Sequence, residues 1–202
     1  MKKIAIIGAS GHGKVVADIA DRLGYDPIVF LDDDESVKQC GDYPVVGKST
    51  DAESLCCDVF VAIGNIKIRR RIQKMLENAG VPIPTLIHPN AVVAKDVKIG
   101  KGTVIMAGAV INPGSVLGEG CIINTCASVD HDCSVGDYVH VAVGAHLCGT
   151  VEIGEDTWVG AGALISNNRY VCPDCMIGAG AVVVRNIRDA ATYVGVPAKK
   201  TD

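Results

Sequence analysis

The stretch INTCASVDHDCSVGDYVHV, residues 123–141, has an aliphatic residue at every sixth position: Ile123, Val129, Val135 and Val141. The same spacing continues in both directions, from Ile87 to Val183, without interruption. Neighbours on one face of an α-helix recur every three to four residues, so a period of six does not describe a helix. A fixed short period is typical of repeat architectures, and a period of six indicates a parallel β-helix.

Each unit of six reads aliphatic-x-x-x-small-x, and Ala, Ser, Thr or Cys holds most of the fifth positions. Three units then form one triangular turn of about 18 residues, with successive turns roughly 4.8 Å apart, the spacing of strands in a sheet. Glycine often follows the aliphatic residue, and there we expect tight corners or backbone with positive φ. These glycines are Gly100, Gly118, Gly136, Gly154, Gly160 and Gly178.

The first 85 residues lack this period and alternate apolar runs with helical patterns. Strands are predicted at 3–7, 28–31 and 59–63, and helices at 15–23 and 66–78. Alternating strands and helices favour a parallel α/β arrangement. The sequence therefore predicts a Rossmann-like α/β domain over residues 1–85 and a β-helix over residues 86–202.

A glycine-rich loop, GASGHG at residues 8–13, lies between the first strand and the first helix. Backbone N–H groups at such a position bind phosphate, and acidic residues after the next strand, here Asp32 and Asp33, bind ribose or base. The spacing G-x-x-G-x-G is not the dinucleotide pattern and the unit is short, which favours a mononucleotide such as that of an activated sugar. A tight turn without a ligand is the alternative.

Composition excludes several classes of protein. The net charge of −4 and the absence of a basic run argue against nucleic acid as a partner. No apolar stretch approaches 18 residues, so no membrane span is expected. The run Ile4 to Ile7 is too short for a signal peptide, and we expect a cytoplasmic protein. Of nine cysteines, three fill small positions of the repeat, and Cys172 and Cys175 form a single C-x-x-C, so we expect reduced thiols and no metal.

His131 stands between two carboxylates, Asp130 and Asp132, at the third position of its unit. A histidine beside an acid can be held in one tautomer and kept basic, as a general base requires. A surface histidine with solvated acids is the alternative.

Six motifs in order carry a family resemblance: GASGHG (8–13), FLDD (30–33), AIGN (62–65), HDC (131–133), HVAVGA (140–145) and GVPAK (195–199). Together they resemble bacterial nucleotide-sugar N-acetyltransferases of the hexapeptide-repeat family, which includes the bacillosamine-pathway enzyme and is related to sialic acid O-acyltransferases. The resemblance implies a left-handed coil and a homotrimer with sites between subunits. It also implies transfer of acetyl from acetyl-CoA to the 4-amino group of a UDP-linked amino-dideoxy sugar.

The resemblance also implies roles for individual residues. His131 matches the catalytic base, and Asp132 the neighbouring acid, where the family also uses the longer Glu. The matching acetyl-CoA contacts are His140, Gly149, Ala161 and Ala179, of which Gly149 offers a backbone N–H that could steady an oxyanion. The matching substrate contacts are Ser10, Gly11, His12, Asp32, Asp33, Gly64 and Asn124.

Several alternatives stay open. The acceptor can be a hydroxyl of sialic acid or a glycan, or the amine of GDP-perosamine. An alternative from a different functional class is a non-enzymatic protein, a sugar-nucleotide sensor or assembly partner. A hexapeptide carbonic anhydrase needs three metal-binding histidines, which the spacing does not supply. Lys199 and Lys200 meet a coenzyme A phosphate or lie in a solvated tail. Arg169 fills a small position, and we expect a bulge over 167–170.

Overall fold

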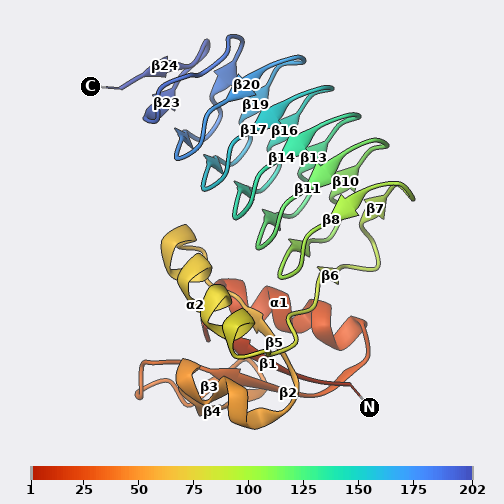
Figure 1. The fold of residues 1–202 in the computed structure, drawn as a ribbon, viewed down its shortest axis with the longest axis vertical. Helices are drawn as coiled ribbons and strands as arrows, with labels where there is room; N and C mark the ends of the chain where they lie inside the picture. Colours follow the sequence, from red (N-terminus) through yellow and green to blue (C-terminus); the bar gives the residue numbers. More distant parts are fainter. Residues whose placement is uncertain (1, 202) are drawn as a thin grey trace. The chain divides into compact units, whose positions relative to one another are not determined.

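The structure is a computed structural model that describes residues 2–201, and the chain divides after Pro89 into two compact units. In the first unit the sheet order is β3-β4-β2-β1-β5 (Figure 1). Its strands are β1 (Lys2–Ile7), β2 (Tyr25–Leu31), β3 (Gln39–Cys40), β4 (Tyr43–Gly47) and β5 (Asp58–Val61). Within this sheet β3 and β4 form an antiparallel hairpin, and β1 pairs in parallel with β2 and β5, as β2 does with β4. The helices are α1 (Gly11–Arg22), the 3-10 helix η1 (Ser49–Leu55) and α2 (Ile66–Asn78), and β6 (Leu86–Ile87) ends the unit.

The predicted alternation of strands and helices is confirmed, and α2 has the predicted bounds. Asn65 sets the start of α2, because its side chain accepts the backbone N–H of Ile68 at 3.1 Å. The strand β4 and the hairpin partner β3 were not predicted. Their segment, 39–47, contains Pro44 and two glycines and lacks a long apolar run.

Two glycines of the 8–13 loop are explained by backbone conformation and packing, without a ligand. Gly8 has φ +107, which side chains rarely adopt. A Cβ at Gly13 would lie 2.1 Å from the carbonyl oxygen of Gly8 and 2.9 Å from the ring of Phe30. By contrast, a Cβ at Gly11 or at Gly64 would meet nothing within 4 Å. The loop therefore packs tightly against β1 and β2 while the space above Gly11 stays open.

The second unit is a parallel β-helix, built mostly of two-residue strands that stack in three sheets (Figure 1). One sheet holds β7 (Val92–Val93), β10 (Val110–Ile111), β13 (Ser128–Val129), β16 (His146–Leu147), β19 (Leu164–Ile165) and β22 (Val182–Val183). The second holds β8 (Lys98–Ile99), β11 (Val116–Leu117), β14 (Ser134–Val135), β17 (Glu152–Ile153) and β20 (Tyr170–Val171). The third includes β9 (Val104–Ile105), β12 (Ile122–Ile123), β15 (His140–Val141), β18 (Trp158–Val159), β21 (Met176–Ile177), β23 (Thr192–Val194) and β24 (Lys199–Lys200).

From β7 to β22, each strand residue pairs with the residue 18 positions away, as Ile123 does with Val141, whereas Met176 of β21 pairs with Thr192 of β23, 16 positions on. From Ile105 to Val183, every aliphatic residue of the repeat is buried, whereas Ile87, Val93 and Ile99 are partly exposed. A first turn has a following turn but no preceding one to cover it. The repeat thus forms the interior of the coil, as its period predicts.

The expectation of positive φ at the glycines that follow the aliphatic residues was wrong. None of them has positive φ; instead, every sixth residue from Gly102 to Gly180 does, including the non-glycine Asp132. A Cβ at Gly136 would lie 2.6 Å from the backbone nitrogen of Glu155, and one at Gly160 would lie 2.6 Å from that of Ala179. These glycines are therefore required by the close approach of the next turn, not by their own backbone angles.

The bulge expected over residues 167–170 is also absent, so that prediction was wrong. The backbone ladder continues through this segment, with Asn168 N–H donating to Gly149 at 3.0 Å and Glu152 N–H donating to Arg169 at 2.9 Å. Arg169 is accommodated at a partly exposed position without a shift in register.

Candidate active site

His131 and Asp132 form a hydrogen-bonded pair on the turn between β13 and β14. The imidazole Nδ1 lies 2.8 Å from Asp132 Oδ2, so the shorter Asp does reach the histidine. The left-handed backbone of Asp132, with φ +57, turns its side chain back toward its neighbour. With Nδ1 engaged by the carboxylate, Nε2 is the nitrogen left to accept a proton.

A second carboxylate fixes the same histidine from its other side. Asp130 Oδ1 accepts the backbone N–H of His131 at 2.8 Å and the side-chain amide of Asn112 at 2.7 Å. The hydrogen bond with Asp132, and then the charge of Asp130, raise the pKa of His131 above its usual value. Asn112 and the His131 N–H in turn lower the pKa of Asp130. The arrangement favours proton uptake by an exposed imidazole.

Asp130 and Asn112 were not among the predicted site residues. Asn112 lies 18 residues before Asp130, at the same place in the preceding turn. The repeat length alone was therefore a signal that could have paired them.

A second group of polar residues lies on the third sheet. His140 is stacked on Trp158, with ring centroids 4.1 Å apart. The side chain of Asn124 is oriented by Thr125, whose N–H donates to Asn124 Oδ1 at 2.8 Å, so the amide nitrogen faces His140 Nε2 at 3.1 Å. The amide therefore donates, Nε2 accepts, and the histidine carries its proton on Nδ1.

These residues line a mainly apolar groove of about 450 Å³. The predicted positions Asn124, His140, Ala161 and Ala179 all contribute to it, whereas His131, Asp132 and Gly149 do not. The remaining lining residues are Ala142, Val143, Trp158, Gly160, Met176, Ile177 and Gly178. A long, narrow organic group with few charges fits such a lining. Within a single chain, the histidine pair therefore does not belong to the groove.

In the first unit, the two predicted acids, Asp32 and Asp33, accept hydrogen bonds from their own chain. Asp32 Oδ2 accepts the N–H of Ala9 at 2.7 Å, and Oδ1 accepts that of Asp34 at 2.9 Å. Asp33 accepts both the N–H and the hydroxyl of Ser49, and these bonds lower the pKa of Asp33. Asp32 therefore ties the glycine loop to the end of β2, and only its remaining lone pairs are available to a ligand.

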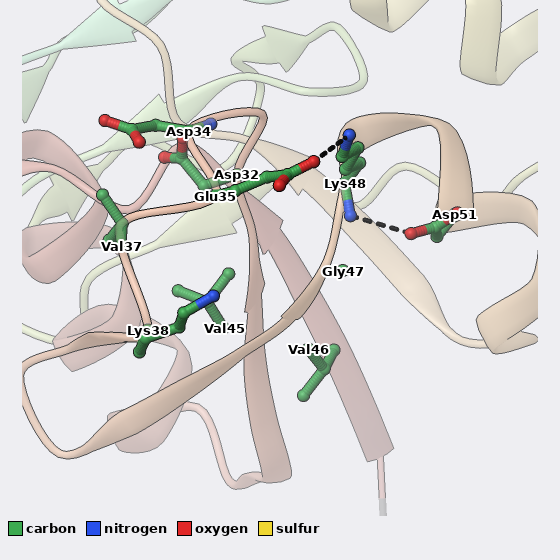
Figure 2. Close-up of a pocket in the computed structure, with 10 residues that line it drawn as sticks. All are labelled: Asp32, Asp34, Glu35, Val37, Lys38, Val45, Val46, Gly47, Lys48 and Asp51. Atoms are coloured by element: carbon green, nitrogen blue, oxygen red, sulfur yellow. Dashed lines mark hydrogen bonds and ion pairs between the residues drawn. The ribbon is translucent and has the colours of Figure 1, made fainter.

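Asp32 also lines a pocket of about 360 Å³ at the ends of β2 and β4, shown in Figure 2. Lys48 crosses its rim, where its ammonium lies 2.6 Å from Glu35 and its backbone N–H donates to Asp51. Asp33 does not line this pocket. The pocket therefore presents both acidic and basic side chains to a polar ring of a ligand.

His12 and Ser10 stand at the start of α1. Burial, and then the charge of Arg69, lower the pKa of His12 to about 4, so this imidazole is neutral near pH 7. Its Nε2 is buried and has no hydrogen-bond partner within residues 2–201. Arg69 holds the neighbouring loop by donating to the carbonyls of Ile63 and Gly64 at 2.9 and 3.0 Å. Ser10 is exposed at the N-cap, and its side chain does not cap the helix.

The two lysines considered for a coenzyme A phosphate lie outside these groups. Lys199 and Lys200 are exposed on β24, beside a cavity of about 390 Å³ that Arg185 and Tyr193 also line. The imidazole of His146 is hydrogen-bonded to the hydroxyl of Ser128 at 2.8 Å. The nine cysteines are free thiols. No helix within residues 2–201 has the length and apolar character that a membrane crossing requires.

Comparison with known protein families matches both units. Residues 3–76 match the family described as the PglD N-terminal domain, and residues 84–113 match the bacterial transferase hexapeptide (six repeats). The chain is 32% identical over 161 residues to GDP-perosamine N-acetyltransferase of Escherichia coli O157:H7, which covers 76% of this chain and 73% of that protein. It is 38% identical over 113 residues to UDP-N-acetylbacillosamine N-acetyltransferase of Bacillus subtilis (strain 168), with 53% and 52% covered.

Solved structures resemble the chain over its whole length. The acetyltransferase domain of PglB from Neisseria gonorrhoeae FA1090, in complex with acetyl coenzyme A, is 46% identical with a TM-score of 0.96 and 99% of each chain covered. PerB from Caulobacter crescentus, in complex with CoA and GDP-perosamine, is 36% identical with a TM-score of 0.94 and 100% and 98% covered. The predicted fold class, a Rossmann-like domain followed by a left-handed parallel β-helix, is thereby confirmed.

Proposed function

The chain belongs to the hexapeptide-repeat sugar N-acetyltransferases that carry a PglD N-terminal domain, and on this premise we propose that it moves acetyl from acetyl-CoA to the 4-amino group of a UDP-linked amino-dideoxy sugar. Residues 1–85 bind the nucleotide sugar, and residues 86–202 carry the transfer. The observation that supports the chemistry best is the His131–Asp132 pair, exposed on a rigid coil with Nε2 available.

The reaction requires a deprotonated amine, a polarised thioester and a leaving thiolate. His131 Nε2 takes the proton that the sugar nitrogen loses as it attacks the acetyl carbonyl, and Asp132 stabilises the imidazolium through Nδ1. Gly149 lies one turn beyond His131, and its N–H donates to no acceptor within residues 2–201. That N–H is suited to stabilise the oxyanion of the tetrahedral intermediate, which then collapses with release of the coenzyme A thiolate.

Acetyl-CoA binds along the apolar groove of the third sheet. His140 and Trp158 form a flat platform there, and Ala161 and Ala179 leave room for a chain to pass. Since His131 does not line this groove, we infer that a complete site combines the histidine pair of one subunit with the groove of another, in a homotrimer. Nine free thiols fit the cytoplasmic location that we infer.

The nucleotide loop supports a nucleotide-linked acceptor. Gly11 and Gly64 leave open space beside the start of α1, where phosphate can reach backbone N–H groups, and Ser10 and neutral His12 flank it. Asp32 and Asp33 follow β2 directly, and we infer that they contact the nucleoside. GDP-perosamine is the second candidate acceptor, because one relative is a GDP-perosamine N-acetyltransferase.

A panel assay tests the proposal. Release of free thiol from acetyl-CoA is measured with UDP-4-amino sugars, GDP-perosamine and sialic acid as acceptors. Turnover with a UDP-linked amine supports the proposal. Turnover with GDP-perosamine alone would show that the acceptor carries GDP and not UDP. Turnover with sialic acid alone would show that the enzyme is an O-acetyltransferase and not an N-acetyltransferase. Binding of all compounds without turnover would favour a sensor.

A further inference from the structure

One residue in the turn before the histidine pair and one in the turn after it are glycines, Gly114 and Gly149. Residues 18 apart are stacked in this coil. Gly149 therefore stacks on His131, and Gly114 stacks on Asp132. Side chains that stack in adjacent turns normally compete for space, so a glycine at either place leaves a gap beside the pair.

Gly149 is covered by the imidazole itself. A Cβ on this residue would lie 2.4 Å from His131 Nε2, 2.7 Å from Cε1 and 3.1 Å from Cδ2. All three distances are shorter than ordinary van der Waals contact. The ring of His131 thus rests in the place that a side chain of residue 149 would occupy.

Gly114 has the same relation to the carboxylate. A Cβ there would lie 2.3 Å from Asp132 Oδ1, the oxygen that does not bond to the histidine. The φ of Gly114 is +76, so this residue also meets a backbone requirement. Gly149 has no left-handed φ, and the three heavy atoms nearest to a Cβ there all belong to the imidazole.

The backbone around the pair leaves only the side chains free to move. Asp132 N–H donates to Pro113 at 3.0 Å, Thr150 N–H donates to His131 at 2.9 Å, and the N–H of His131 is held by Asp130. A methyl group at residue 149 therefore displaces the ring and not the chain. Such a displacement moves Nε2 and strains or breaks the bond between Nδ1 and Asp132.

We propose that Gly149 is a positioning residue for the acetyl transfer, because the space left by its missing side chain sets where the His131 imidazole lies against Asp132. Gly114 leaves the matching space for the Asp132 carboxylate. The functional part of this inference rests on the proposed function, since it assumes that His131 is the base. The geometric part does not depend on any substrate.

The test variant is Gly149→Ala, with Cys148→Ala as the control that changes the adjacent residue without placing an atom against the imidazole. Histidines are labelled with ¹³C at Cε1, the His131 signal is identified by its loss in His131→Gln, and its titration is followed by NMR. In Gly149→Ala the titration midpoint of His131 is expected to fall toward that of a free histidine, because the hydrogen bond that raises its pKa weakens. In Cys148→Ala the midpoint stays at the wild-type value.

Two further measurements separate positioning from other roles. The kcat of Gly149→Ala is expected to fall roughly 10- to 100-fold, while the Kd of coenzyme A, measured by calorimetry, stays unchanged. The loss of thermal stability caused by Gly149→Ala is expected to disappear in a His131→Ala background, because the ring that it displaces is then absent.

An unchanged His131 titration in folded Gly149→Ala overturns the inference, and a loss of coenzyme A affinity with that titration unchanged assigns Gly149 to the cofactor alone. If the His131 titration shifts in Gly149→Ala but the wild-type protein acetylates no nucleotide sugar, Gly149 positions the histidine and the proposed function is wrong. The two proposals therefore fail separately.

Discussion

The coil and the α/β unit place their polar side chains by different means. In the coil, Asn112 meets Asp130 across one turn of 18 residues, and the same interval stacks Gly149 on His131. In the α/β unit, Asp32 reaches back 23 residues to Ala9, and Tyr25 bonds to Asp58 across 33 residues. A repeat makes neighbours predictable from the numbering, whereas a sheet with crossovers does not.

The largest effect is expected at the coil's histidine. His131→Gln should lower kcat by about 10²- to 10⁴-fold, because an amide cannot take the proton that the amine loses. Binding of acetyl-CoA should be unchanged, since His131 does not line the groove. The measurement is thiol release at saturating substrates, with calorimetry as the control. A variant with wild-type kcat would remove the coil's polar pair from the mechanism.

The next effect contrasts a glycine of each region. Gly136→Ala should reduce the free energy of unfolding by about 1–3 kcal/mol, because its Cβ would meet the backbone of Glu155 in the next turn. Gly11→Ala should change that free energy by less than about 0.5 kcal/mol, because open space surrounds its Cβ. Urea denaturation measures both. Equal losses would contradict the view that turn stacking sets the coil's glycines.

The pH dependence of stability tests the buried histidine of the α/β unit. Folding holds the pKa of His12 at about 4, below its ordinary 6.5, so the unfolded chain takes up a proton that the folded protein refuses. The free energy of unfolding should therefore fall as the pH drops from about 6.5 to 4, by roughly 1–3 kcal/mol.

The control is His12→Gln, which should flatten this part of the curve. The raised pKa of His131 acts with the opposite sign, since folding then favours proton uptake, so the difference between wild type and variant is the quantity to compare. Parallel curves for the two proteins would show that His12 is not held neutral.

The smallest effect is expected where one carboxylate ties the nucleotide loop. Asp32→Asn retains an acceptor for only one of the N–H groups of Ala9 and Asp34, which costs about 1–2 kcal/mol. The KM for the nucleotide sugar should rise roughly 5- to 30-fold, with kcat and the KM for acetyl-CoA nearly unchanged. Steady-state kinetics with each substrate varied checks this. A fall in kcat alone would place Asp32 nearer the chemistry than the loop.

Sequence reasoning went furthest where the period was strict. It found the buried column from Ile105 to Val183 and the pair of His131 and Asp132, which are adjacent in the chain. It noted Asp130 beside His131 but missed the bond of Asp130 to Asn112, although the repeat length relates these two residues. It also missed β4 and the role of Ser49 toward Asp33. The contacts of β4 and of Ser49 join segments of the α/β unit whose separation follows no rule in the sequence.

The sequence by itself determined the coil, the α/β unit before it and the family, because an aliphatic side chain every six residues has one way to be buried and the motifs are local. The tertiary structure decided which groups those motifs contact. It showed that the glycines after the aliphatic residues make room for the next turn, that Asp32 and Asp33 first serve their own chain, and that His131 rests on Gly149. These features depend on distances between atoms of different turns and loops, and such distances exist only once the chain is folded.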